Sequence, residues 1–177
     1  MWERYTIHET LLEELFKSFD KQSEYRILDA GSGRTSLFFL TKAFPNSQVT
    51  AIIYPGDQRK IDGITQCVSA RNYLLEEISI ENFIDKREEF DIVLAHLLLG
   101  EATMFGNTFH AVLSALFNIR THYLVIVDML EDPDVDYRSI LKAISLKGSL
   151  RETAFVDRYI GFLIEVSSND TFLPCSK

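Results

Sequence analysis

Apolar and polar positions form two different patterns along the chain. Short, nearly continuous apolar runs, several of them rich in β-branched residues, predict buried strands at 26–30, 48–54, 90–99 and 122–130, and a weaker strand or a strand followed by a loop at 72–80. Between these runs, apolar residues recur every three or four positions and predict helices at 6–19, 35–44, 58–70 and 108–119, and a turn followed by a helix at 131–147. We expect Thr6 to cap the first helix, with Glu9 three residues on, and Gly148 to end the last one.

The pattern changes after the last helix. Two strand-like runs, 150–157 and 158–166, follow each other with almost nothing between them, which leaves no room for a crossover helix and predicts an antiparallel hairpin. The alternation of strands and helices before it predicts a parallel sheet with helices on both faces. We therefore predict an α/β, doubly wound fold with a mostly parallel seven-stranded sheet and a C-terminal antiparallel hairpin. It forms a single domain over 1–177, with an N-terminal helix in 1–24 and the core in 25–177.

Composition limits the partners. The chain has 177 residues, 46% of them hydrophobic and 25% charged, which suits one globular domain. Its net charge of −8 disfavours nucleic acids and anionic membranes. The two cysteines, Cys67 and Cys175, show no metal-binding spacing, so we expect no metal site and a reducing, cytoplasmic location. No signal peptide is expected, and no apolar run reaches the roughly 18 residues of a membrane span.

The stretch YRILDAGSGRTSLFFL holds the clearest candidate site. Asp29 ends a predicted strand, and Gly31 and Gly33 lie between it and a predicted helix. Such a turn either is only a tight connection or lets a ligand approach the main chain and the amides of the helix start. A dinucleotide would need glycine or alanine where Ser36 stands, and an acid about 20 residues further on that is missing. A zwitterionic or cationic ligand would instead make use of Asp29.

The segment ILDAGSGRT resembles the first motif of class I S-adenosylmethionine-dependent methyltransferases, a hydrophobic run followed by acid-x-Gly-x-Gly-x-Gly. The order of elements, closed by a hairpin, is also similar to that family from about Tyr25 to Ser167. The resemblance implies S-adenosylmethionine as cofactor. It also implies that Asp29, Gly31 and Gly33 hold the methionine moiety, with Thr35 in place of the third glycine.

Two further landmarks of the family concern the nucleoside part of the cofactor. Ile53 stands where the resemblance would place a ribose-binding acid after the second strand, so Asp57 becomes the candidate for that role, although it equally suits a surface turn. Tyr54 is the candidate to stack on the adenine. Glu77, or Glu76 beside it, is the candidate for the adenine amino group, although both also suit a solvated loop.

The acceptor side follows the fourth strand. His96 is the candidate general base there, although a lone histidine in an apolar run is more often structural. Glu101 and Asp128 are further residues that would face substrate. The chain has no N/D-P-P-Y/F segment, which disfavours DNA amino-group methylation.

Three functions follow. The first is a methyltransferase that acts on a small molecule or a protein; it needs no dedicated catalytic residue, because alignment and proton removal supply most of the chemistry. The alternative, motivated by Ile53 and Thr35, is a catalytically degenerate relative that serves as a binding or assembly subunit. The third is a nucleotide-binding or dehydrogenase-like domain.

Overall fold

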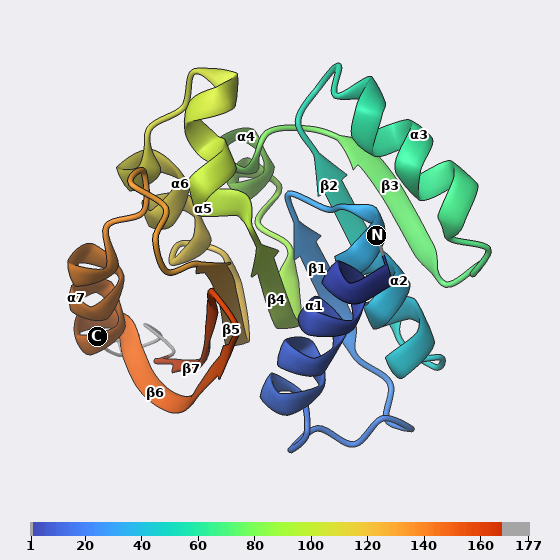
Figure 1. Ribbon diagram of the computed structural model, residues 1–177, viewed down its shortest axis with the longest axis horizontal. Helices are drawn as coiled ribbons and strands as arrows, with labels where there is room; N and C mark the ends of the chain where they lie inside the picture. Colours follow the sequence, from blue (N-terminus) through green and yellow to red (C-terminus); the bar gives the residue numbers. More distant parts are fainter. Residues whose placement is uncertain (1, 168–177) are drawn as a thin grey trace, which may run out of the picture.

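A computed structural model describes residues 2–167, and the side chains of 6–167 except that of residue 103. Its strands form one sheet in the order β3-β2-β1-β4-β5-β7-β6 (Figure 1). The strands are β1 (Arg26–Ala30), β2 (Gln48–Ile53), β3 (Tyr73–Glu77), β4 (Glu89–His96), β5 (Arg120–Met129), β6 (Gly148–Val156) and β7 (Tyr159–Val166). The first five run parallel, and β7 is antiparallel to both β5 and β6. The predicted doubly wound sheet with its closing hairpin is confirmed.

Helices cover both faces of this sheet (Figure 1). One face packs against α1 (Trp2–Leu15), α2 (Arg34–Ala43) and α3 (Gln58–Cys67), and the other against α4 (Ile80–Phe83), α6 (Phe109–Leu116) and α7 (Tyr137–Lys147). In β4, Ile92 and Leu94 point to the first face, and Val93 and Ala95 to the second; all four are buried. Burial on both sides explains why this strand reads as a continuous apolar run.

Three short elements complete the chain: η1 (Ile84–Lys86), α5 (Leu98–Glu101) and η2 (Ala102–Phe105). No helix within residues 2–167 has both the length and the apolar character needed to cross a membrane. Cys67 is a free, exposed thiol, and Cys175 lies outside the described residues.

Of the two expected helix ends, the cap at Thr6 is wrong and the end at Gly148 is confirmed. Because α1 begins at Trp2, Thr6 lies inside the helix, and its carbonyl oxygen accepts from the Thr10 hydroxyl at 2.8 Å. Gly148 is the C-cap of α7, where its amide donates to the Ile144 carbonyl, but its φ of −172° is extended and it also opens β6. A Cβ there would lie 2.5 Å from the Glu165 carbonyl oxygen, so this glycine permits close strand pairing, not a left-handed helix end.

Two strands end before their apolar runs do. The run expected at 90–99 leaves the sheet after His96, because Leu97 adopts a left-handed φ of 59° while its amide donates to the Val127 carbonyl at 2.8 Å. In the run at 72–80 the strand stops at Glu77 and Ile80 begins α4, which agrees with the alternative of a strand followed by a loop. As a result, residues 97–105 fold over the carboxyl edge of the sheet, where the candidate site lies.

Candidate functional site

Asp29 occupies the carboxyl end of β1, and its side chain is fully buried. The hydroxyls of Ser32 and Ser36 both donate to its Oδ2, the second at 2.8 Å. Its Oδ1 is buried without a hydrogen-bond partner among the described residues. Burial raises the pKa of Asp29 to about 6, although both serines and the charge of Lys60 act in the opposite direction. Near neutral pH this carboxylate is therefore ionised and has an acceptor to spare.

The two glycines of the turn differ in what they require. Gly31 has a left-handed φ of 70°, and a Cβ on it would lie 2.5 Å from Leu98 Cδ1. Gly33 has a φ of −138°, and a Cβ there would meet nothing within 4 Å. Thr35 lies elsewhere: it lines, with Phe38 and other residues, a groove of about 450 Å³ beside α1 and α2. Only Gly31 therefore depends on being a glycine.

The end of β2 supplies an apolar wall and one acid. Ile53 is buried, and the cavity beside Gly31 is lined by it and by Tyr54. Asp57 is 8% exposed and so is not a surface residue. Its Oδ1 accepts from the Lys60 amide at 3.2 Å as the cap of α3, whereas its Oδ2 is buried and has no hydrogen-bond partner within the described part. Asp57 therefore combines a structural role with a second unused acceptor.

The acids after β3 are arranged differently from the expectation. The exposed Glu77 accepts from the Gly56 amide at 3.3 Å and so supports the turn after β2. Glu76 forms an ion pair with Lys86. Glu81 of α4 also lines the cavity, and neither of its buried oxygens has a hydrogen-bond partner in the described chain. The sequence analysis missed Glu81, because an acid in the first turn of a helix is also the usual complement to the helix dipole.

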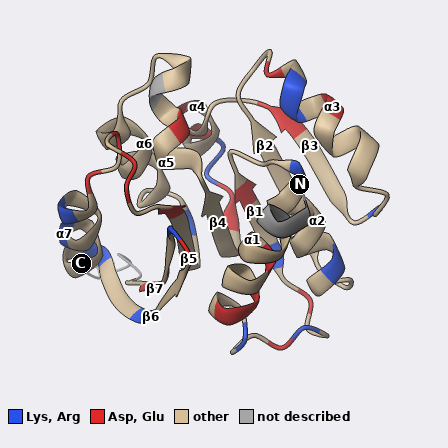
Figure 2. Ribbon diagram, viewed as in Figure 1, with Lys and Arg blue, Asp and Glu red and all other residues tan. Residues whose placement is uncertain are grey.

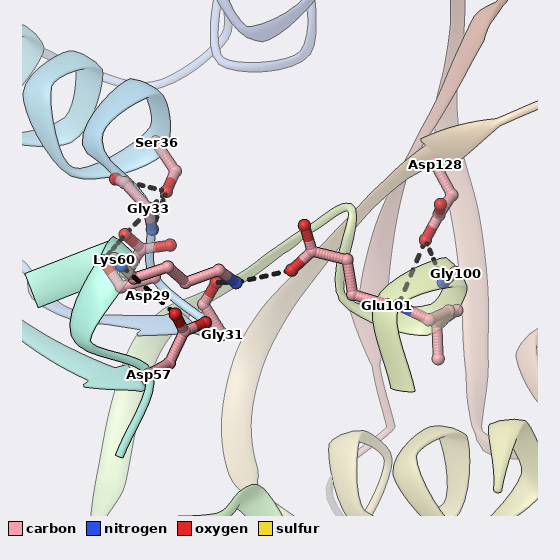
Figure 3. A network of polar contacts seen from close by, with 11 residues as sticks. Asp29, Gly31, Gly33, Ser36, Asp57, Lys60, Gly100, Glu101 and Asp128 are labelled. Atoms are coloured by element: carbon pink, nitrogen blue, oxygen red, sulfur yellow. Dashed lines mark hydrogen bonds and ion pairs between the residues drawn. The ribbon is translucent and has the colours of Figure 1, made fainter. Parts of the chain in front are cut away.

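Side chains occupy most of the space beside the glycine turn. The Lys60 ammonium donates to the Gly31 carbonyl at 3.1 Å and forms an ion pair with Glu101 at 2.6 Å (Figure 3). The rings of Tyr54 and Phe105 stack with centroids 4.7 Å apart and 24° between their planes. A cavity of about 40 Å³ remains, whereas ligand pockets usually measure about 300 Å³ or more. A nucleoside-sized ligand therefore requires some of these side chains to move.

His96 ends β4 at the same edge, and its Nε2 lies 3.0 Å from Nδ1 of His8 in α1. Burial, together with the charges of His8 and Lys60, lowers the pKa of His96 to about 3. The imidazole is therefore neutral around pH 7, but it is a weak base. General-base catalysis by His96 stays a prediction, and a neutral hydrogen-bonding role suits this environment better.

Asp128 ends β5 and fixes the start of α5. Its Oδ2 accepts from the amides of Leu99 at 3.1 Å and Gly100 at 3.3 Å. Burial raises the pKa of Asp128 to about 7. The charge of nearby Asp132 raises it as well, whereas the hydrogen bonds from backbone amides lower it. Acidic residues also mark the ends of β1 and β3, α5 and the loop after β5, whereas basic residues lie in the first turn of α3 (Figure 2). This edge suits a ligand that donates hydrogen bonds or carries positive charge.

The chain shares its fold with solved methyltransferases. Magnesium protoporphyrin IX methyltransferase from Synechocystis PCC 6803, solved with bound S-adenosylmethionine, superposes with a TM-score of 0.74 at 12% identity, over 93% of this chain and 80% of that one. Fibrillarin in complex with Nop5p gives a TM-score of 0.68 at 11% identity, over 92% and 84%. An O-methyltransferase family protein from Burkholderia thailandensis gives 0.69 at 12% identity, over 96% and 57%.

The sequence matches no protein-family model and no curated protein. At identities this low, the comparisons define the architecture alone. The chain has the class I methyltransferase fold, as the resemblance of its glycine turn implies.

Proposed function

We propose that this protein is an S-adenosylmethionine-dependent methyltransferase whose acceptor is a small molecule or a protein. The observation that carries the proposal is a set of buried, unused acceptors around one glycine turn: Oδ1 of Asp29, Oδ2 of Asp57 and both carboxylate oxygens of Glu81. Buried acceptors without donors are costly in a folded protein. A ligand with an ammonium group, ribose hydroxyls and an adenine amino group would supply such donors. The bound cofactor in the Synechocystis enzyme supports this assignment by analogy of fold.

The residues present fit this cofactor in polarity. Asp29 and the Gly31 carbonyl would hold the ammonium end, Asp57 would accept from the ribose, and Glu81 rather than Glu77 from the adenine amino group. Tyr54 would offer its ring once Phe105 moves. When bound, the cofactor supplies a methyl group on a positively charged sulfonium, so the chain itself must mainly orient the acceptor and exclude water.

His96 would accept a hydrogen bond from the acceptor group without carrying charge itself. The acidic edge around it favours an acceptor with hydrogen-bond donors over an anionic one. A cytoplasmic location, which the usage of the two cysteines favours, and the absence of nucleic-acid partners, which the net charge of −8 favours, remain part of the proposal.

Ligand binding tests this function. S-Adenosylhomocysteine at about 100 times its dissociation constant should stabilise the protein by about 2.7 kcal/mol, measured as a shift in Tm and confirmed by calorimetry. NAD serves as the control ligand and should give no shift. Asp57→Asn keeps the oxygen that caps α3 but replaces the unused one with an amide, so it should weaken binding while leaving the fold intact. No response to millimolar S-adenosylhomocysteine would contradict the proposal.

A second function is supported by a separate observation. The cavity of about 40 Å³, the ion pair between Lys60 and Glu101 and the apolar Ile53 all suit a catalytically degenerate relative that binds or assembles with another protein. This function predicts that wild-type protein and variants without the ion pair alike fail to bind S-adenosylhomocysteine, whereas methylation of any acceptor by the purified protein would exclude it.

A further inference from the structure

One short segment carries three of the side chains that fill the site. Residues 97–106, which we call the lid segment, include α5 and η2. Leu98 lies against Gly31, Glu101 forms the ion pair with Lys60, and Phe105 stacks on Tyr54.

The ends of the lid segment have the backbone conformation of hinges. Leu97 at its start has a φ of 59° and Gly106 at its end a φ of 75°. A left-handed φ is unfavourable at leucine, whereas glycine adopts it freely, and a Cβ at Gly106 would meet nothing within 4 Å. Between them, Asp128 holds the start of α5 through the Leu99 and Gly100 amides. Residues that absorb φ and ψ changes at both ends are typical of loops that open.

The lysine in contact with the lid resembles part of a ligand. The Lys60 ammonium donates to the Gly31 carbonyl at 3.1 Å, and its positive charge counteracts the raised pKa of Asp29. An amino-acid-like ligand would place its own ammonium against the same two groups. Both cannot occupy the position, because two ammonium groups at one carbonyl would repel each other and overlap. Lys60 must therefore withdraw, which also releases Glu101.

We propose that residues 97–106 form a lid over the glycine turn, closed in the arrangement that the structure shows, with the Lys60–Glu101 ion pair as its latch and the Lys60 ammonium in the place of the ligand's ammonium. The inference rests on the proposed function for the identity of the ligand. The side chains of Lys60 and Glu101 are 14% and 29% exposed, so the pair is partly shielded from solvent. Part of the ligand's binding energy must be used to open the lid. The apparent affinity is therefore the affinity of the open form multiplied by the fraction of molecules that are open.

Calorimetry with S-adenosylhomocysteine tests the latch. Lys60→Met and Glu101→Gln should each bind it more tightly than wild type, by about tenfold if the closed lid limits binding. Glu89→Gln is the matched control, because it removes an exposed ion pair with Arg120 at the opposite edge of the sheet and should leave the affinity unchanged. Weaker binding by Lys60→Met would overturn the inference, since it would mean that Lys60 holds the ligand.

Hydrogen exchange without any ligand tests the lid independently. Amides of residues 98–106 should exchange faster in Glu101→Gln than in wild type or Glu89→Gln, while those of β1 and β4 remain unchanged. Equal exchange in 98–106 would overturn the lid whatever the calorimetry gives. Faster exchange without S-adenosylhomocysteine binding in any variant would support the lid and refute the cofactor instead.

Discussion

Replacing Asp29 with asparagine should remove a pH-dependent loss of stability and prevent the binding of S-adenosylhomocysteine. Folding raises the pKa of this carboxyl from 3.8 to about 6, mainly through burial. The native protein therefore holds the proton more tightly than the unfolded chain does. The resulting stabilisation is complete below pH 3.8 and is lost as the pH rises through about 6. A shift of about 2 pKa units corresponds to about 3 kcal/mol.

The side-chain amide of the Asp29→Asn variant does not ionise, so the free energy of unfolding of this variant should not show the decrease that Asp29 causes as the pH rises through about 6. The difference in unfolding free energy between variant and wild type should rise by about 3 kcal/mol between about pH 4 and about pH 8. Its absolute level depends on how the new amide is accommodated beside Ser32 and Ser36, so the pH dependence is the diagnostic quantity. Other titrating groups, among them His96 and Asp128, are present in both proteins and cancel in the difference.

Urea unfolding followed by circular dichroism across this pH range measures the difference, and calorimetry at neutral pH measures S-adenosylhomocysteine binding by the same protein. If the difference in unfolding free energy between variant and wild type does not change with pH, the pKa of Asp29 is not raised by burial. A pH-dependent gain together with undiminished binding would confirm the electrostatics but refute the role of Asp29 in holding the ligand.

Three further predictions concern the same edge of the sheet. Gly31→Ala should lower the free energy of unfolding by about 1–3 kcal/mol through a strained φ and overpacking, whereas Gly33→Ala should leave urea unfolding almost unchanged; equal effects would contradict the assigned geometry. Asp57→Ala should cost about 1 kcal/mol in urea unfolding by removing the cap of α3, and Asp57→Asn, which retains an acceptor oxygen, should restore most of it. Because the pKa of His96 is lowered to about 3, its ring should remain neutral at about pH 5 in a nitrogen NMR titration, and a charged ring at pH 5 would refute its burial. The pKa of His96 in the folded protein lies below the ordinary 6.5, so its contribution to the stability of the native state is complete above pH 6.5 and is lost as the pH falls towards about 3.

The strands and the hairpin could be predicted because they depend on local pattern. The apolar runs in β1, β2 and β5 are buried on both faces, and the short connection before β7 forces antiparallel pairing. The end of β4 could not be predicted in the same way. Leu97–Leu99 continue the apolar run, and what turns them out of the sheet is a contact of the Leu99 amide with Asp128, far away in the sequence.

The residues of the candidate site also differ in whether local sequence predicts them. Asp29 and Gly31 lie two positions apart in the sequence, so a local motif predicts them. Lys60, Glu81 and Glu101 reach the cavity from α3, α4 and α5. Lys60 and Glu81 have the pattern of ordinary charged helix residues, and the ion pair of Glu101, a candidate on the substrate side, with Lys60 was not expected. Their convergence depends on how three helices pack against one sheet edge, which no local spacing specifies.

The insertion of β7 between β5 and β6 has a consequence for synthesis on the ribosome. The strand β5 emerges well before its partner β7, so the nascent chain carries a bare edge of the kind that invites aggregation or chaperone binding. The first helix, although made earliest, must also wait, because Leu15 packs against Gly161 of β7. A nascent chain stalled after α7 should therefore be sensitive to protease along its whole length, and should acquire resistance in one step when β7 leaves the tunnel.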